Sequence, residues 1–264
     1  MRHLGHFNCR KDYMKMGKVN TYKNILSNLP DWDEYLLKES GLPGPRANLE
    51  LLQAVVDVGT EETFIRYLNF NLMNDSTNIP EEFLTICGTV GLGKLISEGK
   101  KQFLNDLRHF SSDKRWRIRE GVAIALQLLG DSDIDLVLRE MEIWRKGNLL
   151  ERRAVVATLC EPRLLTQNNT VQQVLGFLDQ LTEDLLDICD RKEENFKTLR
   201  KTLGYGWSVA VVADPQNGKD LMEKWFSNED KDIRWIMKEN LRKERLSRMD
   251  KQWTSKWKQT LGVK

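Results

Sequence analysis

The chain of 264 residues is poor in the side chains that build most catalytic and metal sites. It has only three histidines and four cysteines, and His109 has no Ser or Cys partner at the spacing of a nucleophilic motif. Three of the cysteines lie among apolar residues in expected helices, which favours small buried side chains in a reducing compartment. The sequence therefore predicts no catalytic residue, no metal site and no cofactor. The four cysteines are Cys9, Cys87, Cys160 and Cys189.

Long apolar runs are also absent. No stretch approaches the roughly 20 residues that span a bilayer, and the first residues lack the apolar core of a secretory signal. We therefore expect a cytoplasmic protein without a membrane partner. With 40% hydrophobic and 30% charged residues, the chain has the composition of a folded protein that can bury a sizeable core.

A strong overall charge is missing as well, because the formal net charge is only +2. The charge is unevenly spread: residues 1–23 carry +5 and residues 238–264 carry +6, which leaves −9 between them. Basic ends can bind nucleic acid or acidic partners, but solvated tails and helix faces have the same composition. We expect residues 1–22 to form a basic N-terminal tail.

One pattern in this tail is compatible with metal binding. His3, His6 and Cys9 stand at three-residue intervals, so one face of a helix could present all three. A structural zinc site needs four ligands on a fixed framework, and no fourth ligand lies nearby. We do not predict a metal site from this pattern.

Helical periodicity dominates the rest of the sequence, where strand patterns are scarce. In DKRWRIREGVAIALQLLG, residues 113–130, the apolar residues from Ile118 to Leu129 form one stripe on a helix. Gly130 is expected to end this helix in the left-handed conformation. Asp131, Ser132 and Asp133 offer caps for a second helix with an apolar face from Ile134 to Trp144. The pattern predicts two antiparallel helices joined by a tight turn.

The same pattern recurs along the chain. IREGVAIAL from Ile118 aligns without gaps on ERRAVVATL from Glu151 and on IRWIMKENL from Ile233, and LRKTLGYGW from Leu199 is a weaker copy. The arginines at the second position are 33, 48 and 34 residues apart, within the range of helical-hairpin repeats. We expect them to contact the preceding turn or the acidic turn of the next repeat and so to tie hairpins together. These repeat arginines are Arg119, Arg152, Arg200 and Arg234.

The order Asp, Ile-Arg, small-apolar-apolar over residues 113–129, followed by Gly130 and Asp131, resembles the armadillo-like HEAT-repeat superfamily, including its bacterial members of undefined function. The resemblance is clearest over residues 103–246, and residues 31–99 fit only as divergent hairpins. It implies an all-α fold, a right-handed α-solenoid of stacked antiparallel hairpins in one domain over residues 23–264, with a C-terminal capping helix and a basic tail. Families of this kind act as curved binding scaffolds, and some bacterial members bind DNA.

Several element boundaries can be predicted from local signals. SGLPGPRANLELL from Ser40 predicts a rigid turn before a helix over about residues 46–58, and a helix around residues 32–39 precedes it. NDSTNIP, residues 74–80, is the expected flexible loop. A C-terminal helix is expected from Asp232 to about Met249.

GTVGLGK, residues 88–94, allows two interpretations. Its spacing is that of a phosphate-binding loop, but Leu95 stands where a Ser or Thr would hold Mg²⁺. The alternative is that Gly88 and Gly91 permit close helix packing and that Gly99 ends the helix. We favour the packing interpretation.

The eight tryptophans also allow two interpretations. A tryptophan at the packing position of a hairpin fills the space between layers, which suits Trp144, Trp207 and Trp225. Tryptophan and arginine are also the residue types that anchor protein interfaces, and the cluster around Trp116 exceeds what the repeat needs. The predicted binding residues are Arg115, Trp116, Arg117, Trp207 and Trp235.

From this pattern the leading hypothesis is a non-catalytic scaffold that binds another protein or a peptide through its concave or rim surface. The alternative is a nucleic-acid-binding or base-repair protein of the same fold, since tryptophan and arginine can stack on bases and contact phosphates. HEAT-like DNA alkylation-repair glycosylases use tryptophan with a carboxylate in a basic cleft. Their catalytic positions find no residue-by-residue match here, and Asp113 and Asp214 are the available carboxylates. The acidic middle of the chain argues against a groove that grips DNA.

Overall fold

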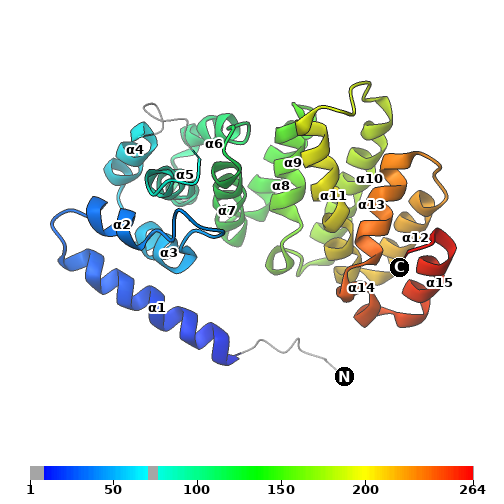
Figure 1. Ribbon diagram of the computed structural model, residues 1–264, viewed down its shortest axis with the longest axis horizontal. Helices are drawn as coiled ribbons and strands as arrows, with labels where there is room; N and C mark the ends of the chain where they lie inside the picture. Colours follow the sequence, from blue (N-terminus) through cyan, green and yellow to red (C-terminus); the bar gives the residue numbers. More distant parts are fainter. Residues whose placement is uncertain (1–8, 71–76, 264) are drawn as a thin grey trace. The chain divides into compact units, whose positions relative to one another are not determined.

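Figure 1 shows the computed structural model of the protein, which describes residues 9–70 and 77–263. Every regular element in these two ranges is a helix, so the predicted all-α class is confirmed. Within the same ranges, none of the helices is long and apolar enough to cross a membrane. Contacts divide the chain into two compact units, residues 1–125 and 126–264. The prediction of one domain over residues 23–264 did not anticipate this division.

The first unit is built around one central helix, α5 (Glu81–Ser97), which is buried along almost its whole length. The residues of α5 itself are mostly apolar or small on every side of the helix. Helix α5 can therefore pack against α2, α3, α4 and α6 at once. The first helix, α1, packs against α3. The other elements of this unit are α1 (Cys9–Asn28), α2 (Asp33–Glu39), α3 (Leu49–Val58), α4 (Glu61–Asn69), η2 (Lys101–Phe103), α6 (Leu104–Phe110) and the start of α7 (Trp116–Ser132).

The N-terminal boundaries differ in part from the predicted ones. Residues 9–22, expected in a basic tail, form the first part of α1. The helix expected from about residue 46 begins at Leu49, because the Asn48 side chain accepts a hydrogen bond from the Leu51 backbone N–H at 3.1 Å and caps it. In the predicted loop, residues 74–76 lie outside the described residues, and residues 77–79 are not helical.

The GTVGLGK segment is entirely helical, which rules out the phosphate-binding loop. Its glycines allow close packing instead, as the alternative predicted: a Cβ on Gly91 would lie 2.2 Å from the Phe64 ring. A Cβ on Gly88 would lie 2.8 Å from the Phe64 carbonyl oxygen. Gly99, with φ +98°, follows the helix, so its predicted role as the terminator of α5 is confirmed.

The second unit consists of hairpins whose second helices are neighbours. Helix α11 contacts both α9 and α13, while α10 contacts α12, and Figure 1 shows α9, α11 and α13 side by side. Helix α15 packs on α13 and α14 at the C-terminal end. The elements are α8 (Ile134–Trp144), α9 (Leu149–Leu159), η3 (Pro162–Leu164), α10 (Asn168–Asp184), η4 (Leu185–Asp187), α11 (Glu194–Ala213), α12 (Pro215–Phe226), α13 (Lys231–Leu241), α14 (Glu244–Met249) and α15 (Lys251–Leu261).

Two predicted helix ends in this region are wrong. Gly130 does not end α7, which continues to Ser132 without a left-handed residue. Asp133 then caps α8 by accepting the Leu136 backbone N–H at 2.8 Å, as expected from its residue type. The helix expected from Asp232 to Met249 is two helices, because the backbone at Lys243 is extended between α13 and α14.

In three of the four aligned segments, the eighth residue meets a preceding helix. This residue is Ala125 in α7, Gly206 in α11 and Asn240 in α13. A Cβ on Gly93 of α5 would lie 2.4 Å from the Ala125 carbonyl oxygen, and a Cβ on Gly206 would lie 2.6 Å from Val156 of α9. The Asn240 side chain hydrogen-bonds the backbone of α11. Close approach at this position explains why small side chains occupy it in two of the three helices.

Candidate functional site

The two arginines beside Trp116 are turned into the protein. Arg115 is 4% exposed and binds Asp113 through two contacts of its guanidinium, at 2.7 and 3.0 Å. Arg117 is 6% exposed, and its Nη1 lies 3.2 Å from Oε2 of Glu82 on α5. Both guanidinium groups are engaged in contacts inside the protein, and the contact of Arg115 and Arg117 with a partner stays a prediction.

Trp116 itself is exposed at the first turn of α7. Its side chain is 48% exposed, and the Arg117 guanidinium carbon lies 4.5 Å from the centre of its ring system. Beside it is a cavity of about 320 Å³ between α7 and the segment that leads into α3. We call this the Trp116 groove. It is lined by Pro45, Arg46, Ala47, Leu49, Leu52, Ile86, Trp116, Arg117, Glu120, Gly121 and Ile124.

One wall of the groove follows the turn at residues 41–44. Gly41 adopts φ +75°, the peptide bond between Leu42 and Pro43 is cis, and the Gly44 carbonyl oxygen accepts a hydrogen bond from Arg117 Nη2 at 2.6 Å. Arg117 Nη2 also donates to Asn78 Oδ1 at 3.1 Å. The buried arginine therefore joins α7 to the turn before α3, and both sides of the groove are held by the same guanidinium.

Trp207 cannot belong to a binding surface. Its side chain is fully buried, and its indole N–H donates to the Thr182 hydroxyl at 3.0 Å. The interpretation of Trp207 as a packing residue is confirmed, and its assignment as a partner contact is wrong because no part of the ring reaches solvent. Trp144 and Trp225 are buried in the same way.

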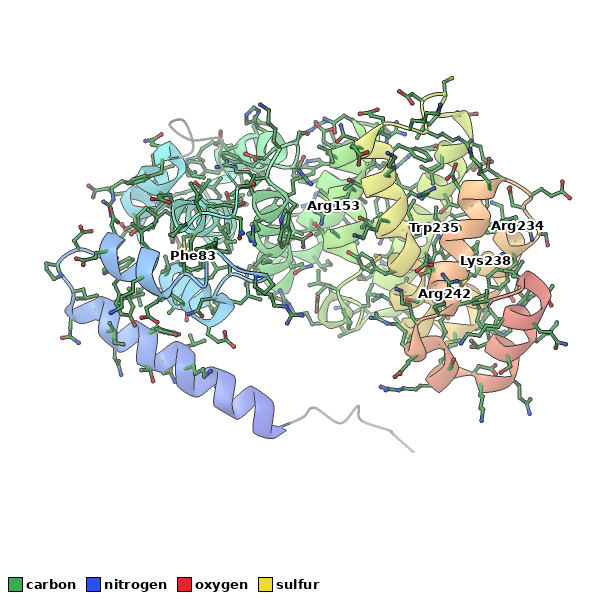
Figure 2. All side chains as sticks on the ribbon, in the orientation of Figure 1. Phe83, Arg153, Arg234, Trp235, Lys238 and Arg242 are labelled. Carbon is green, nitrogen blue, oxygen red and sulfur yellow. The ribbon has the colours of Figure 1, made fainter. Side chains whose placement is uncertain are left out.

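Trp235 is partly buried on the side of α13 that faces α11. The Arg200 guanidinium carbon lies 4.5 Å from the centre of its ring system. A Cβ on Gly204 would lie 3.1 Å from the same ring, so α11 holds the indole closely. These residues border a second cavity of about 330 Å³, lined by Lys197, Arg200, Lys201, Gly204, Tyr205, Trp235, Glu239 and Lys243. Figure 2 labels Trp235 together with Arg234 and Lys238 of the same helix and Arg242 at its C-cap.

Three of the four repeat arginines make the kind of contact that was expected. Arg119 Nη1 donates to the carbonyl oxygens of Asp113 and Lys114 in the preceding turn, at 2.5 and 2.9 Å. Arg152 donates to the Gly147 carbonyl at 3.0 Å, and Arg200 forms a short ion pair with Asp232.

Arg234, the fourth repeat arginine, is exposed, and its side chain has no hydrogen-bond or ion-pair partner among the described residues. Its predicted structural role is wrong, because Arg191 occupies the acidic turn instead. Arg191 Nη1 binds Asp230 at 2.5 Å and Asp232 at 3.2 Å. Two opposing effects act on the pKa of Asp230. Burial alone would raise this pKa, but the hydrogen bonds from Arg191 and from two backbone N–H groups outweigh burial, so the pKa is lowered. Sequence reasoning missed Arg191 because it lies outside the aligned repeat.

The carboxylates of Asp113 and Asp214 are engaged in local contacts, and the thiol of Cys160 is buried. Asp113 binds Arg115, and Asp214 caps α12 by accepting the Asn217 backbone N–H at 3.3 Å. Burial raises the pKa of Cys160 to about 12, so this thiol stays neutral.

The remaining cysteines differ in their exposure. Cys87 is also buried, but Cys189 is exposed, contrary to expectation. The described part of the chain contains no cluster of three possible metal ligands. His3 and His6 lie outside the described residues, as does the side chain of Cys9.

No family model matches the chain, and no curated protein matches it significantly.

Proposed function

We propose that this protein is a non-catalytic scaffold of stacked helical hairpins, a HEAT-like right-handed α-solenoid, that binds another protein or a peptide. Support for the stacking comes from the row of α9, α11 and α13 in the second unit. Further support comes from the eighth repeat position, where Gly206 and Asn240 each meet the preceding helix of that row. Repeats of this kind share one core with their neighbours and leave a long surface free for partners.

The observation that carries the binding proposal is the exposed Trp116 above a groove with mostly apolar walls. Tryptophan is enriched among the residues that dominate binding energy at interfaces. A cavity of about 320 Å³ lies at the lower end of the usual range for ligand pockets, roughly 300–1,000 Å³. This size suits one large apolar side chain of a partner that packs between Trp116 and Leu49, which is itself 55% exposed.

The test compares partner capture by three purified proteins: the natural chain, Trp116→Ala and Ile143→Ala. Ile143 is the matched control, because it is an apolar side chain that is 50% exposed, belongs to α8 of the other unit and does not line the groove. A protein that binds the natural chain and Ile143→Ala, but not Trp116→Ala, is the expected partner.

The affinity of that partner is then measured by calorimetry on the purified pair. Loss of a central tryptophan typically costs at least about 2 kcal/mol, so the dissociation constant should rise about 30-fold. Equal binding to the natural chain and Trp116→Ala, in a variant with an unchanged circular dichroism spectrum, would remove the groove from the proposal.

Nucleic-acid binding is the second candidate, and one observation favours it. Lys201, Arg234, Lys238 and Lys243 lie on or next to α11 and α13, and none has an ion-pair partner among the described residues. Base repair has less support, because the carboxylates of Asp113 and Asp214 are engaged in local structural contacts.

A further inference from the structure

The two halves of the second unit carry net charges of opposite sign. Residues 126–190 carry a net charge of −6, whereas residues 191–264 carry +7. Part of the positive charge lies on neighbouring surfaces of α11 and α13, where side chains border the cavity of about 330 Å³. We define the basic face by four residues of this region that have no hydrogen-bond or ion-pair partner among the described side chains: Lys201, Arg234, Lys238 and Lys243.

Three cations on and directly after α13 are regularly spaced. Arg234 and Lys238 on the helix and Arg242 at its C-cap follow one another at intervals of four residues, so they lie along one side about 6 Å apart. Figure 2 labels all three. Arg242 is neutralised by a short ion pair with Glu239, which leaves Arg234 and Lys238 as the unpaired charges of this row. Lys201 on α11 and Lys243 add two charges at the cavity.

We propose that the basic face binds an acidic segment of a partner protein. The proposal rests on the protein-binding function proposed above and adds the chemistry of one contact. Alternate residues of an extended peptide are about 6.6 to 6.8 Å apart. Carboxylates at alternate positions of such a segment therefore match the spacing of the cations on α13. Charge complementarity of this kind mainly raises the association rate and fixes the orientation of the partner.

Two features of the basic face favour a peptide over nucleic acid. The indole of Trp235 has the Arg200 guanidinium over its ring system and Gly204 against its edge, so it offers little surface to a stacking base. Glu239 lines the cavity and is paired with Arg242, so neither of the two residues adds a net charge that could hold a phosphate there. A peptide can place its own backbone N–H groups opposite this carboxylate, because only its side chains carry charge.

The experiment measures fluorescence anisotropy with a labelled peptide of about 12 residues in which Glu and Ser alternate. A peptide of alternating Lys and Ser serves as the charge control, and single-stranded and duplex DNA of about 20 nucleotides serve as competing ligands. The variant is R234E/K238E. The matched control is R139E/K251E, which changes the net charge equally at exposed residues of α8 and α15 that also lack partners among the described residues.

We expect the acidic peptide to bind the natural chain in a salt-dependent way and the Lys-Ser peptide not to bind. R234E/K238E should weaken binding about tenfold or more, while R139E/K251E should change it less than about twofold. No binding of the acidic peptide, or equal weakening by both variants, overturns the proposal. Tighter binding of either DNA, with the same dependence on R234E/K238E, also overturns it and assigns the face to nucleic acid.

The outcome is independent of the test of the Trp116 groove. Trp116→Ala should leave binding of the acidic peptide unchanged, since Trp116 lies in the other unit. If Trp116→Ala loses a partner but the acidic peptide does not bind, the proposal for the basic face is refuted and the proposed scaffold function stands. If the peptide binds but capture does not depend on Trp116, the proposal for the Trp116 groove is refuted instead.

Discussion

Replacement of Asn240 by alanine should destabilise the second unit more than any exposed substitution. Asn240 is fully buried in α13, and its side-chain oxygen accepts the Ser208 backbone N–H at 2.8 Å. Its side-chain nitrogen donates to the carbonyl oxygens of Leu203 and Ile236, both at 2.8 Å. Two of these three bonds join α13 to α11, so the amide links neighbouring helices of the row.

The magnitude follows from the groups that Asn240→Ala leaves behind. The substitution removes the side-chain partner of the Ser208 N–H and of the Leu203 carbonyl in a buried contact between helices. Leu203 and Ser208 lie inside α11, where their backbone groups also have helical partners, so the loss is that of three buried hydrogen bonds at about 0.5–1.5 kcal/mol each. The expected loss is about 3 kcal/mol, which corresponds to a fall in melting temperature of roughly 10 °C for a unit of this size.

The assay is urea and thermal unfolding followed by circular dichroism at 222 nm, with Asn169→Ala as control. Asn169 is exposed on α10 and makes no side-chain hydrogen bond among the described residues, so its replacement should change stability by less than about 0.5 kcal/mol. A loss below about 1 kcal/mol for Asn240→Ala would refute the reasoning, since it would mean that the three hydrogen bonds of the amide contribute little to stability.

Three further substitutions or reactions test the fold. Arg119→Glu should lower the free energy of unfolding by about 2–3 kcal/mol, because two carbonyl oxygens lose a charged donor and face a carboxylate. An unchanged melting temperature would contradict the structural role of Arg119. Gly91→Ala should cost about 1–3 kcal/mol through overpacking, whereas Gly176→Ala, with open space around its Cβ, should be neutral or stabilising; the reverse order in urea unfolding would contradict the packing. Iodoacetamide at pH 8 should modify Cys189 in the folded protein and Cys160 only after unfolding, since burial raises the pKa of the Cys160 thiol to about 12; rapid modification of Cys160 by mass spectrometry would contradict this.

Local signals in the sequence were sufficient for the helices and many of their contacts. The apolar stripe of α7 from Ile118 to Leu129 and the cap at Asp133 depend on residues within a few positions of each other, so their spacing alone predicts them. The same holds for the contact of Arg119 with the turn just before its helix.

The direction of side chains in the candidate site could not be predicted in this way. Arg117 turns inward because its partners are Glu82 and the Gly44 carbonyl, which are 35 and 73 residues away in the sequence. No periodicity connects these positions, and the same Arg-Trp-Arg pattern is equally compatible with an exposed guanidinium. The one available signal was the acidic start of α5, where Glu82 lies in an otherwise apolar segment.

Asn240 shows a signal that was present in the repeats but needed the structure to be understood. The eighth position of the aligned segments holds Ala125, Thr158, Gly206 and Asn240, all small or polar within an otherwise apolar pattern. Such a position indicates close approach of a neighbouring helix. The sequence does not reveal that the asparagine amide bonds to that neighbour's backbone.

The ion pair between Arg117 and Glu82 also bears on how long a partner stays bound. Because Glu82 holds the Arg117 guanidinium, the Trp116 ring that lies against this guanidinium is held in place before a partner binds. An anchor that is already ordered avoids about 0.5–1.5 kcal/mol of immobilisation cost on binding. A change at Glu82, which is buried and does not line the groove, would therefore loosen the ring and shorten the lifetime of a complex without altering any atom that the partner touches.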